Sequence, residues 1–435
     1  MKLTNYDSYK DSGVEWLGKI PENWEIKRIK DIAKLNPNTF KFSNFDDSDK
    51  IEFLPMNQVN EIEGKIIKFL FKPFRIVKSG YTAFKNGDIL FAKITPCMEN
   101  GNCVIVSNLR NNLGFGSTEF IVFRTTPGFK RYLHLFLRNK QFLNKAEFFM
   151  TGSAGQKRIS TSYLNVHPIG IPPDFDKIKI SNYLDKKTSQ IDRKIVLLQE
   201  KRESYEELKK SLINETVCLG LNKDVELKDS GIEWIGKIPK NWEVERGKDK
   251  FFYEKKINKG LICKNVLSLT YDGVINKDFN TNAGLNPGSY ETYQFVNKGD
   301  LIFKLIDLEN IKTSRVGIAH EHGIMSSAYI RLKSKKSIFS KYYYYLYFFY
   351  YRINLFNFLG GGVRSTLNYS SLLEIPIISP PFIEEQIQIA NYLDEKTLKI
   401  ENIISKINAQ IESLKEFRKT LINDVVTGKV RIQDE

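Results

Sequence analysis

The chain repeats its own sequence, and this repeat constrains its fold more than any other feature. The segment from Lys10 to Asp31 returns as Lys228 to Asp249, with identical residues at 16 of 22 positions. A second pair of segments, Ile180 to Ile191 and Ile389 to Ile400, reads ISNYLDKKTSQI and IANYLDEKTLKI. Each half of the 435-residue chain therefore starts and ends in the same way, and we expect two copies of one structural plan.

Between these anchors the two halves differ strongly, but short matches follow in the same order. Asn86 to Phe91 matches Lys298 to Phe303, and in both a Gly-Asp pair precedes an apolar run. This pattern predicts a turn that leads into a buried strand. Phe129 to Tyr132 matches Phe339 to Tyr342, where we expect a helical stretch that ends in a glycine-rich loop. A shared scaffold with divergent interiors predicts two modules that perform the same task on two different targets.

The charge of the chain favours a polyanionic partner. Lys and Arg number 66 against 51 Asp and Glu, so the formal net charge is +15, which favours nucleic acid over a small acidic ligand. The alternative is that the lysine content follows from an AT-rich genome. The apolar content of 41% is enough to fill the cores of about three domain-sized units.

The cysteines and the N-terminal segment favour a reducing, cytoplasmic location. The four cysteines form no CxxC pair and have no His at zinc-finger spacing, so neither disulfides nor a structural zinc is expected. The N-terminal residues lack the apolar stretch of a signal peptide. The apolar segment Tyr342 to Leu359 contains Arg352 and a run of tyrosines, and its counterpart Tyr132 to Met150 holds several charges. Both segments are therefore expected to be helices packed on their own domains rather than membrane spans.

Both repeated end segments carry a hydrophobic residue at every seventh position. This spacing keeps one stripe of an α-helix facing a partner helix, so it predicts two long coiled-coil helices that pair with each other. The alternative is a long helix that lies on its own globular domain. The stripe residues are Leu184, Ile191, Leu198, Tyr205 and Leu212 in the first segment and Leu393, Ile400, Ile407, Leu414 and Leu421 in the second. The residues expected to fill parts of a second stripe are Ile180, Leu208, Ile389, Ile403 and Phe417.

No sequence pattern supports a catalytic or metal site. Ser379 to Phe382 resembles the catalytic tetrapeptide of amino-methyltransferases, but no glycine-rich nucleotide-binding turn follows a strand at suitable spacing. The chain also has no GxxxxGK[ST] phosphate loop. His320 and His322 lack a third metal ligand at recognisable spacing, and the carboxylates of Pro173 to Lys177 are crowded into one short linker, unlike those of a nuclease. We therefore assign no catalytic residue and no metal ligand.

The repeated segments resemble the specificity subunits of type I restriction–modification systems over the whole chain. In that family DSGxEWxGxIPxxWE opens two target-recognition domains, matched here at Asp11 to Glu25 and Asp229 to Glu243. A proline pair followed by IAxYLDxKTxxI opens two long helices. Such chains often read Pro-Pro-x-x-Glu-Gln before the helix. The second half keeps this pattern in Glu385-Gln386, whereas the first half has Lys177-Ile178, so a polar contact at the helix entry is expected to differ between the copies.

The resemblance implies a mixed α/β chain with a pseudo-twofold internal repeat. Its implied parts are two DNA target-recognition domains, residues 1–176 and 221–383, and two long antiparallel coiled-coil spacer helices, residues 177–220 and 384–430. It further implies a non-catalytic subunit in which each domain reads one half of an asymmetric bipartite site in double-stranded DNA. The helices would set the spacer of that site and dock the modification subunits.

The resemblance also implies partners. These are two modification (methyltransferase) subunits and ATP-dependent restriction subunits, which would carry S-adenosylmethionine, ATP and Mg²⁺, while this chain would bind no cofactor. Two alternatives stay open: a stand-alone DNA-binding protein of the same fold, and a coiled-coil scaffold for protein interactions.

The glycine-rich loops are the best candidates for DNA contact. Glycine lets the backbone approach a phosphate, and Gln or Arg binds base edges in bidentate fashion. Lysines just after the repeated strand could neutralise phosphates. For each of these residues an ordinary surface turn is the alternative. The candidates are Lys93, Gln156, Lys157, Arg158, Lys304, Arg364, Ser365 and Thr366.

Overall fold

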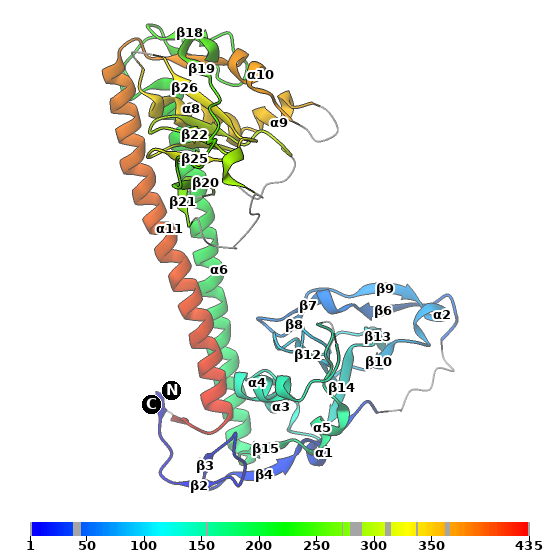
Figure 1. Cartoon of the computed structure of the whole chain (residues 1–435). Helices are drawn as coiled ribbons and strands as arrows, with labels where there is room; N and C mark the ends of the chain where they lie inside the picture. Colours follow the sequence, from blue (N-terminus) through cyan, green and yellow to red (C-terminus); the bar gives the residue numbers. More distant parts are fainter. Residues whose placement is uncertain are drawn as a thin grey trace. The chain divides into compact units, whose positions relative to one another are not determined.

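The computed structural model of the chain describes residues 2–37, 45–153, 155–271, 273–278, 289–308, 315–335, 338–361 and 366–433. It divides into two compact units, unit 1 with Met1–Gln199 and Ala409–Glu435 and unit 2 with Glu200–Asn408. Each unit contains one globular domain and a segment of both long helices, α6 (Asp174–Leu219) and α11 (Ile383–Val426) (Figure 1). We call the part of unit 1 that precedes α6 the first domain, and the part of unit 2 between α6 and α11 the second domain.

The first domain is built around two four-stranded sheets. One has the order β12-β11-β14-β5 with antiparallel pairing throughout. The other has the order β10-β13-β6-β9, in which β13 and β6 run parallel. The strands of the former are β5 (Ala33–Leu35), β11 (Ile89–Ala92), β12 (Cys103–Ile105) and β14 (Phe120–Thr125). Those of the latter are β6 (Lys50–Leu54), β9 (Leu70–Pro73), β10 (Thr82–Phe84) and β13 (Gly114–Gly116).

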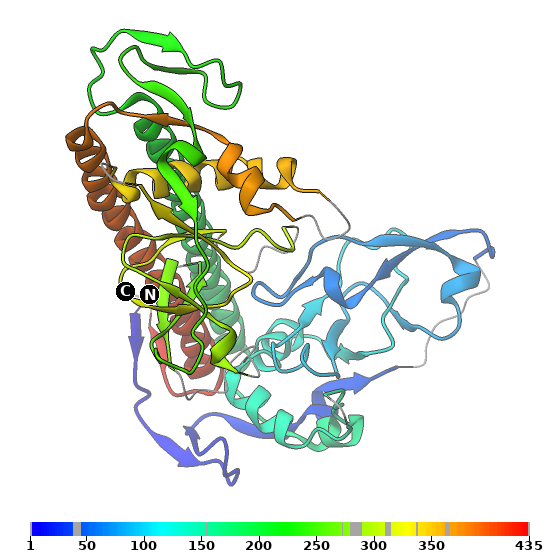
Figure 2. The same ribbon diagram turned by 45° about the horizontal axis from the view of Figure 1, so that its top comes forward.

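Shorter elements complete unit 1. Four antiparallel pairs lie outside the two sheets: β1 with β28, β2 with β3, β4 with β15 and β7 with β8. Their bounds are β1 (Lys2–Thr4), β2 (Tyr9–Asp11), β3 (Lys19–Pro21), β4 (Glu25–Arg28), β7 (Val59–Asn60), β8 (Lys65–Ile66), β15 (Pro168–Ile171) and β28 (Arg431–Gln433). The helices are α1 (Ile29–Ile32), η1 (Met56–Gln58), α2 (Phe74–Val77), α3 (Lys130–Phe136), α4 (Lys140–Phe148) and α5 (Thr161–Val166). Because β1 pairs with β28, the two chain ends lie side by side (Figures 1 and 2).

The second domain repeats the strand order of both four-stranded sheets. One sheet has the order β24-β23-β26-β19, all antiparallel, and the other has the order β22-β25-β20-β21, again with one parallel pair, β25 and β20. Outside them, β16 pairs with β17 and β18 pairs with β27. The predicted shared fold of the two halves is therefore confirmed, although their interiors differ in sequence. The bounds are β16 (Leu227–Asp229), β17 (Lys237–Pro239), β18 (Glu243–Arg246), β19 (Phe251–Tyr253), β20 (Val266–Thr270), β21 (Gly273–Lys277), β22 (Gln294–Val296), β23 (Leu301–Phe303), β24 (Val316–Ile318), β25 (Gly323–Met325), β26 (Ile330–Ser334) and β27 (Pro376–Ser379), with the helices α7 (Gly247–Lys250), η2 (Tyr290–Thr292), α8 (Ser340–Arg352), α9 (Leu355–Leu359) and α10 (Tyr369–Glu374).

The repeated Gly-Asp turn explains why the same strand forms in both domains. Gly87 and Gly299 have φ angles of 89° and 88°, a backbone conformation that only glycine adopts at low cost. The carboxylates of Asp88 and Asp300 each accept the backbone N–H three residues earlier, at 2.9 and 2.7 Å. The strands that follow, β11 and β23, are fully buried, as the sequence predicted.

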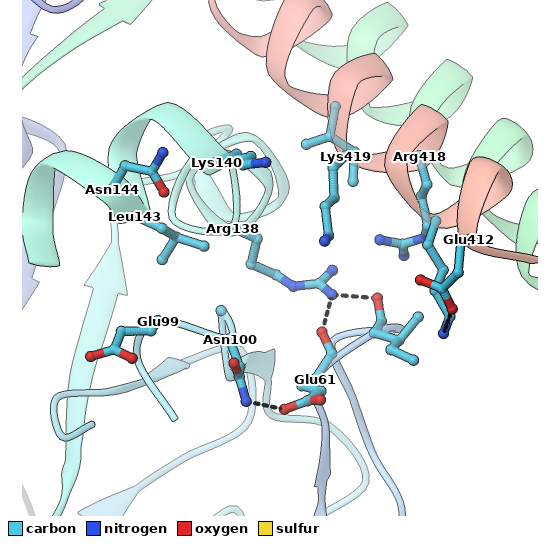
Figure 3. Close-up of a pocket in the computed structure, with 14 residues that line it drawn as sticks. Glu61, Glu99, Asn100, Arg138, Lys140, Leu143, Asn144, Glu412, Arg418 and Lys419 are labelled. Atoms are coloured by element: carbon cyan, nitrogen blue, oxygen red, sulfur yellow. Dashed lines mark hydrogen bonds and ion pairs between the residues drawn. The ribbon is translucent and has the colours of Figure 1, made fainter. Parts of the chain in front are cut away.

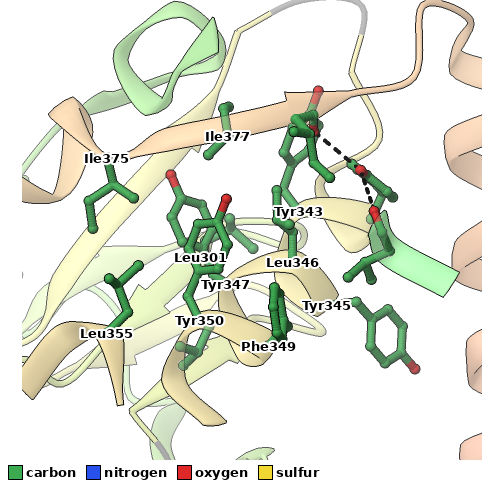
Figure 4. Close-up of a cluster of buried hydrophobic side chains, with 14 of the residues drawn as sticks. Leu301, Tyr343, Tyr345, Leu346, Tyr347, Phe349, Tyr350, Leu355, Ile375 and Ile377 are labelled. Atoms are coloured by element: carbon green, nitrogen blue, oxygen red, sulfur yellow. Dashed lines mark hydrogen bonds between the residues drawn. The ribbon is translucent and has the colours of Figure 1, made fainter. Parts of the chain in front are cut away.

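A run of tyrosines in α8 forms the largest apolar cluster of the second domain (Figure 4). Most of their rings are buried, and several of the hydroxyls, which would be costly to bury alone, find partners, whereas the hydroxyl of Tyr347 has none among the described residues. Tyr350 donates to the carbonyl of Pro376 at 2.8 Å, and Tyr345 donates to the carboxylate of Asp394 in α11 at 2.7 Å. The helix therefore packs on its own domain. Within the described ranges, none of the helices is both long enough and apolar enough to cross a membrane.

The two long helices run antiparallel within each unit. In unit 2, Gly220 at the end of α6 lies beside Glu385 at the start of α11, and Lys209 earlier in α6 pairs at 2.5 Å with Glu401 later in α11. In unit 1, Arg418 of α11 donates to the carboxylate of Asp192 of α6 at 2.8 Å. The predicted antiparallel helix pair is therefore confirmed.

The heptad stripe faces inward along both helices. Six of its residues are buried, namely Leu184, Ile191, Leu393, Ile400, Ile407 and Leu421. The other four are half-buried, namely Leu198, Tyr205, Leu212 and Leu414. The second stripe was partly wrong, because Leu208 and Phe417 are 51% and 55% exposed. Ile195 and Ile411 are buried instead. Near the domain, Ile389 and Leu393 also join the apolar core of the second domain, so the alternative of a helix lying on its own domain is correct for that segment.

The helix entries differ between the copies, as expected. In the second copy the Gln386 side chain accepts the N–H of Phe339 at 2.9 Å and donates to the carbonyl of Pro380 at 3.2 Å. In the first copy the buried ammonium of Lys177 instead lies 3.5 Å from the centre of the Phe129 ring. A cation–π contact, together with an ion pair from Lys177 to Asp174 at 2.6 Å, thus replaces an amide hydrogen-bond pair at the same place.

Candidate nucleic-acid interface

The glycine-rich loop of the first domain is fastened to the segment that follows β11. Ile159 donates its N–H to the carbonyl of Lys93 at 2.9 Å, and Thr95 donates its N–H to the carbonyl of Lys157 at 3.0 Å. A Cβ at Gly152 would lie 2.6 Å from the carbonyl oxygen of Gln156, so the loop needs glycine there. The fold therefore brings the sequence-predicted residues Lys93, Gln156, Lys157 and Arg158 together on one edge of the first domain.

Gln156 and Lys157 are exposed at this edge, but Arg158 has a partner that the sequence did not reveal. Its guanidinium forms a bidentate ion pair with Glu119, with Nη2 to Oε1 at 2.9 Å and Nε to Oε2 at 3.0 Å. The hydrogen bond from Arg158 lowers the pKa of Glu119, and Glu119 in turn raises the pKa of Arg158. The ion pair occupies the Nε and Nη2 edge of the guanidinium, and Nη1 makes only a 3.4 Å hydrogen bond to the carbonyl of Gln156.

The corresponding loop of the second domain is fastened in the same way. Leu367 donates its N–H to the carbonyl of Leu305 at 2.9 Å, which matches the bond from Ile159 to Lys93. Gly361 and Thr366 close the loop with reciprocal backbone hydrogen bonds of 3.2 and 3.0 Å. Thr366 is exposed. The predicted candidates Arg364 and Ser365 lie outside the described residues, so their part in DNA contact stays a prediction.

Lys304 does not occupy the same place as Lys93. Its N–H donates to the carbonyl of Arg315 at 3.0 Å, as the N–H of Ala92 donates to Asn102 at 2.9 Å. Lys304 is therefore the counterpart of Ala92, and Leu305 is the counterpart of Lys93. Burial, and then the neighbouring Arg315, lower the pKa of the Lys304 amine. The position that is bonded to the end of the glycine-rich loop is therefore a lysine in the first domain and a leucine in the second.

Two buried ion pairs support these edges, and sequence reasoning missed both. Asp88 pairs with Arg124 of β14 at 2.7 Å, and Asp300 pairs with Arg331 of β26 at 2.5 Å. In each domain the pair ties the Gly-Asp turn to the neighbouring strand, and hence fixes the strand that carries Lys93 or Lys304. The two arginines stand at different strand positions, so no sequence match marks them.

An exposed phenylalanine precedes each glycine-rich loop. Phe148 ends α4 and is 82% exposed, and Phe358 in α9 is 84% exposed. Rings that are so exposed bury little apolar surface and contribute little to the stability of the fold. In DNA complexes, phenylalanine can contact the methyl group of thymine. Their equal spacing from the repeated Phe129 and Phe339 is the sequence signal that could have found them.

The segments that resemble catalytic or metal sites serve the fold. The Ser379 hydroxyl is buried and hydrogen-bonded to Tyr343 at 3.0 Å, and the carbonyl of Pro380 is bound by Gln386. His320 and His322 bind different asparagine side chains. Of the residues that the structure describes, no three or more His, Cys, Asp or Glu form a group that could hold a metal ion.

Comparison with known proteins relates this geometry to one family. The model of the type I restriction modification DNA specificity domain matches residues 21–203 and 239–413. Over 157 residues, 36% of this chain, the sequence is 40% identical to the EcoAI specificity subunit of Escherichia coli, and it is 37% identical over 164 residues to the EcoEI subunit. These matches span only 26% and 27% of the length of the two relatives. A putative specificity subunit, MjaX of Methanocaldococcus jannaschii, is 25% identical over 96% of both chains.

Solved structures share the fold. A chain from a structural study of complex assembly in the type I R-M system superposes with a TM-score of 0.72, at 15% identity, over 94% of this chain and 99% of its own length. The HsdS subunit of Thermoanaerobacter tengcongensis gives a TM-score of 0.53, at 14% identity, over 94% of this chain and 98% of its own length. The family model covers most of the sequence, once in each repeat. The chain therefore belongs to the family of type I restriction modification DNA specificity domains.

Proposed function

We propose that this chain is the DNA specificity subunit of a type I restriction–modification complex, in which each domain reads one half of an asymmetric bipartite site. The proposal rests on one observation: the two domains share a backbone fold but expose different side chains at their glycine-rich loops. Both domains have the same strand order and the same loop anchor, the bond from Ile159 to Lys93 or from Leu367 to Leu305. The exposed loop residues nevertheless differ, with Gln156 and Lys157 in the first module and Thr366 in the second. Two domains of the same fold with different exposed side chains should recognise half-sites of different sequence.

The long helices would set the spacer between the half-sites. Helix α6 has 46 residues, so at about 1.5 Å per residue it is about 70 Å long. Its inward stripe and the Arg418–Asp192 pair hold it against α11. In dimeric repressors the distance between two reading heads sets the half-site spacing, and helix length would play that role here. The outer faces of the helices would dock the modification subunits.

The chemistry would belong to partner subunits. Two modification subunits would bind S-adenosylmethionine and transfer methyl groups, restriction subunits would use ATP and Mg²⁺, and this chain would act in the cytoplasm without a cofactor of its own. The enclosure of Ser379 by Tyr343 supports a non-catalytic role, because an amino-methyltransferase needs that position open to its substrate.

Methyl transfer by purified components tests the division of labour. The isolated chain, incubated with S-adenosylmethionine and DNA, should transfer no methyl group, whereas the chain assembled with a modification subunit should methylate DNA. Methylation by the isolated chain would refute a non-catalytic role and return attention to Ser379 to Phe382. Sequence-specific binding by the chain alone, with no gain from a modification subunit, would favour a stand-alone DNA-binding protein.

A further inference from the structure

A cleft of about 400 Å³ in unit 1 lies between the first domain and the last turns of α11 (Figure 3). The domain contributes α4, Arg138 just before it, the turn between β7 and β8, and the turn that precedes β12. Five cationic residues line the cleft against three carboxylates: Arg138, Lys140, Lys415, Arg418 and Lys419 against Glu61, Glu99 and Glu412. The residues that line the cleft therefore carry more positive than negative charge, and Asp192 and Glu416, which do not line it, pair with Arg418, Lys419 and Lys140.

Arg138 stands at the centre of this charge without a carboxylate partner. Its guanidinium donates to the backbone carbonyls of Glu61 and Ile62 at 2.8 and 2.6 Å. Its Nε is buried and has no hydrogen-bond partner among the residues described. Burial, and then the positive charge of Arg418, lower the pKa of Arg138 to about 10. The side chains of Arg418 and Lys419 point towards this guanidinium (Figure 3).

The lysines of the cleft are held only by weak pairs. Lys419 and Lys415 contact Glu416 and Glu412 one turn away on the same helix, at 2.8 Å, and Lys140 reaches Glu416 at 3.7 Å. Exposed pairs of this kind contribute little to stability, so the ammonium groups can readily turn to another anion. Arg418, in contrast, is fixed by Asp192.

The second unit has a cleft of about 440 Å³ in the corresponding position, but with different chemistry. By sequence position Phe348 stands where the first domain has Arg138. The only acid–base pair between residues lining it that the structure describes joins Lys209 to Glu401, and Asp394 adds a further carboxylate. The cations of the first cleft are therefore not required by the shared fold, and the excess of positive charge is a property of the first module.

We propose that the cleft around Arg138, Lys140 and Lys419 binds a phosphate group. The source is either the DNA backbone, beside the half-site that the first module reads, or free phosphate. The assignment of the phosphate to the DNA backbone rests on the proposed function. A phosphate would accept hydrogen bonds from the lysines, and such bonds are strong because donor and acceptor are both charged.

The first arm of the test measures binding of the full chain to labelled duplex DNA over a series of salt concentrations. Lys140→Gln and Lys419→Gln should each weaken binding equally for all sequences and reduce the salt slope by about one. Lys399→Gln is the matched control, because Lys399 lies on the same helix, is similarly exposed and also pairs with a glutamate, but does not line the cleft. It should leave both quantities unchanged.

The second arm compares thermal unfolding of the wild type and Lys419→Gln in sodium phosphate and sodium chloride of equal ionic strength. If free phosphate is the ligand, phosphate should raise the Tm of the wild type alone. An effect in the DNA arm identifies a backbone phosphate, and an effect in the second arm alone identifies free phosphate and leaves the cleft valid even if the chain reads no DNA. The proposal would be overturned if Lys140→Gln and Lys419→Gln behaved like Lys399→Gln in both arms. It would also be overturned if these variants lost only their assembly with a modification subunit.

Discussion

Arg158 is clamped by Glu119 in a bidentate ion pair at the edge of the first domain. The carboxylate holds the Nε and Nη2 edge of the guanidinium, so it orients the side chain and leaves Nη1 to reach the edge of a guanine in the DNA complex that we propose.

Loss of the loop side chains should affect one half-site only. Replacing Gln156 and Arg158 by Ala should relax recognition of one half-site by roughly 1–3 kcal/mol per lost bidentate contact and leave the other half unchanged. Arg364→Ala should do the same for the other half-site. Competition binding of the assembled complex against oligonucleotides mutated in either half measures this. Even weakening over all sequences would instead show that these residues only neutralise phosphates.

The ion pair between Arg418 and Asp192 should matter far more than the one between Lys209 and Glu401. The side chains of the former are 8% and 17% exposed, so Asp192→Asn should cost roughly 3–5 kcal/mol because it leaves a buried charge unpaired. Glu401→Gln breaks a pair with 26% and 54% exposure and should cost about 0–1 kcal/mol. Urea unfolding of both variants tests the difference. Equal costs would mean that burial does not set the strength of the helix pairing.

Gly428 should tolerate substitution less well than another glycine of similar backbone conformation. At Gly428 φ is 76°, and an added Cβ would lie 2.5 Å from Pro21 Cδ and 3.2 Å from the indole of Trp24. At Gly231 φ is 71°, and nothing described lies within 4 Å of the added atom. Gly231→Ala should therefore cost only the backbone strain, roughly 1–2 kcal/mol, and Gly428→Ala clearly more. Chemical denaturation that gives the same cost for both would contradict the close packing at the end of α11.

His167 should make unit 1 sensitive to acid. Burial lowers its pKa from 6.5 to about 4, and the ring packs against Trp16 and Phe142. The folded state then binds fewer protons than the unfolded state, so stability is present above pH 6.5 and is lost as the pH falls from 6.5 towards 4, by up to roughly 3 kcal/mol. His167→Phe should flatten this part of the stability profile. An unchanged profile in denaturant unfolding between these pH values would show that other groups dominate.

The sequence predicted the scaffold well because repetition and periodicity are local signals. The repeat located both domains, the Gly-Asp turns located β11 and β23, and the heptads located the stripe from Leu184 to Leu212 and its counterpart. A seven-residue period identifies one inward face directly, whereas the flanking stripe depends on how the helices roll against their neighbours. Leu208 and Phe417 were assigned to that second stripe for this reason, and they face solvent.

The candidate site was harder to predict because its contacts join distant segments. Glu119 meets Arg158 only after β14 and the glycine-rich loop are placed, and no motif marks either residue. Lys93 and Lys304 both follow the repeated strand, but a shift of one residue in a strand moves a side chain to the opposite face of the sheet. Extending the match of Asn86–Phe91 with Lys298–Phe303 without a gap already pairs Lys304 with Ala92, and the backbone hydrogen bonds of Ala92 and Lys304 agree.

Mapping of methylated bases in the genome of a host that carries the complete complex tests the central claim most directly. The account predicts one asymmetric motif in two parts, separated by a spacer of fixed length, and predicts that exchanging the second domain for that of another family member changes one part only. A continuous or palindromic motif, or a change in both parts after the exchange, would contradict the division of recognition between the two domains.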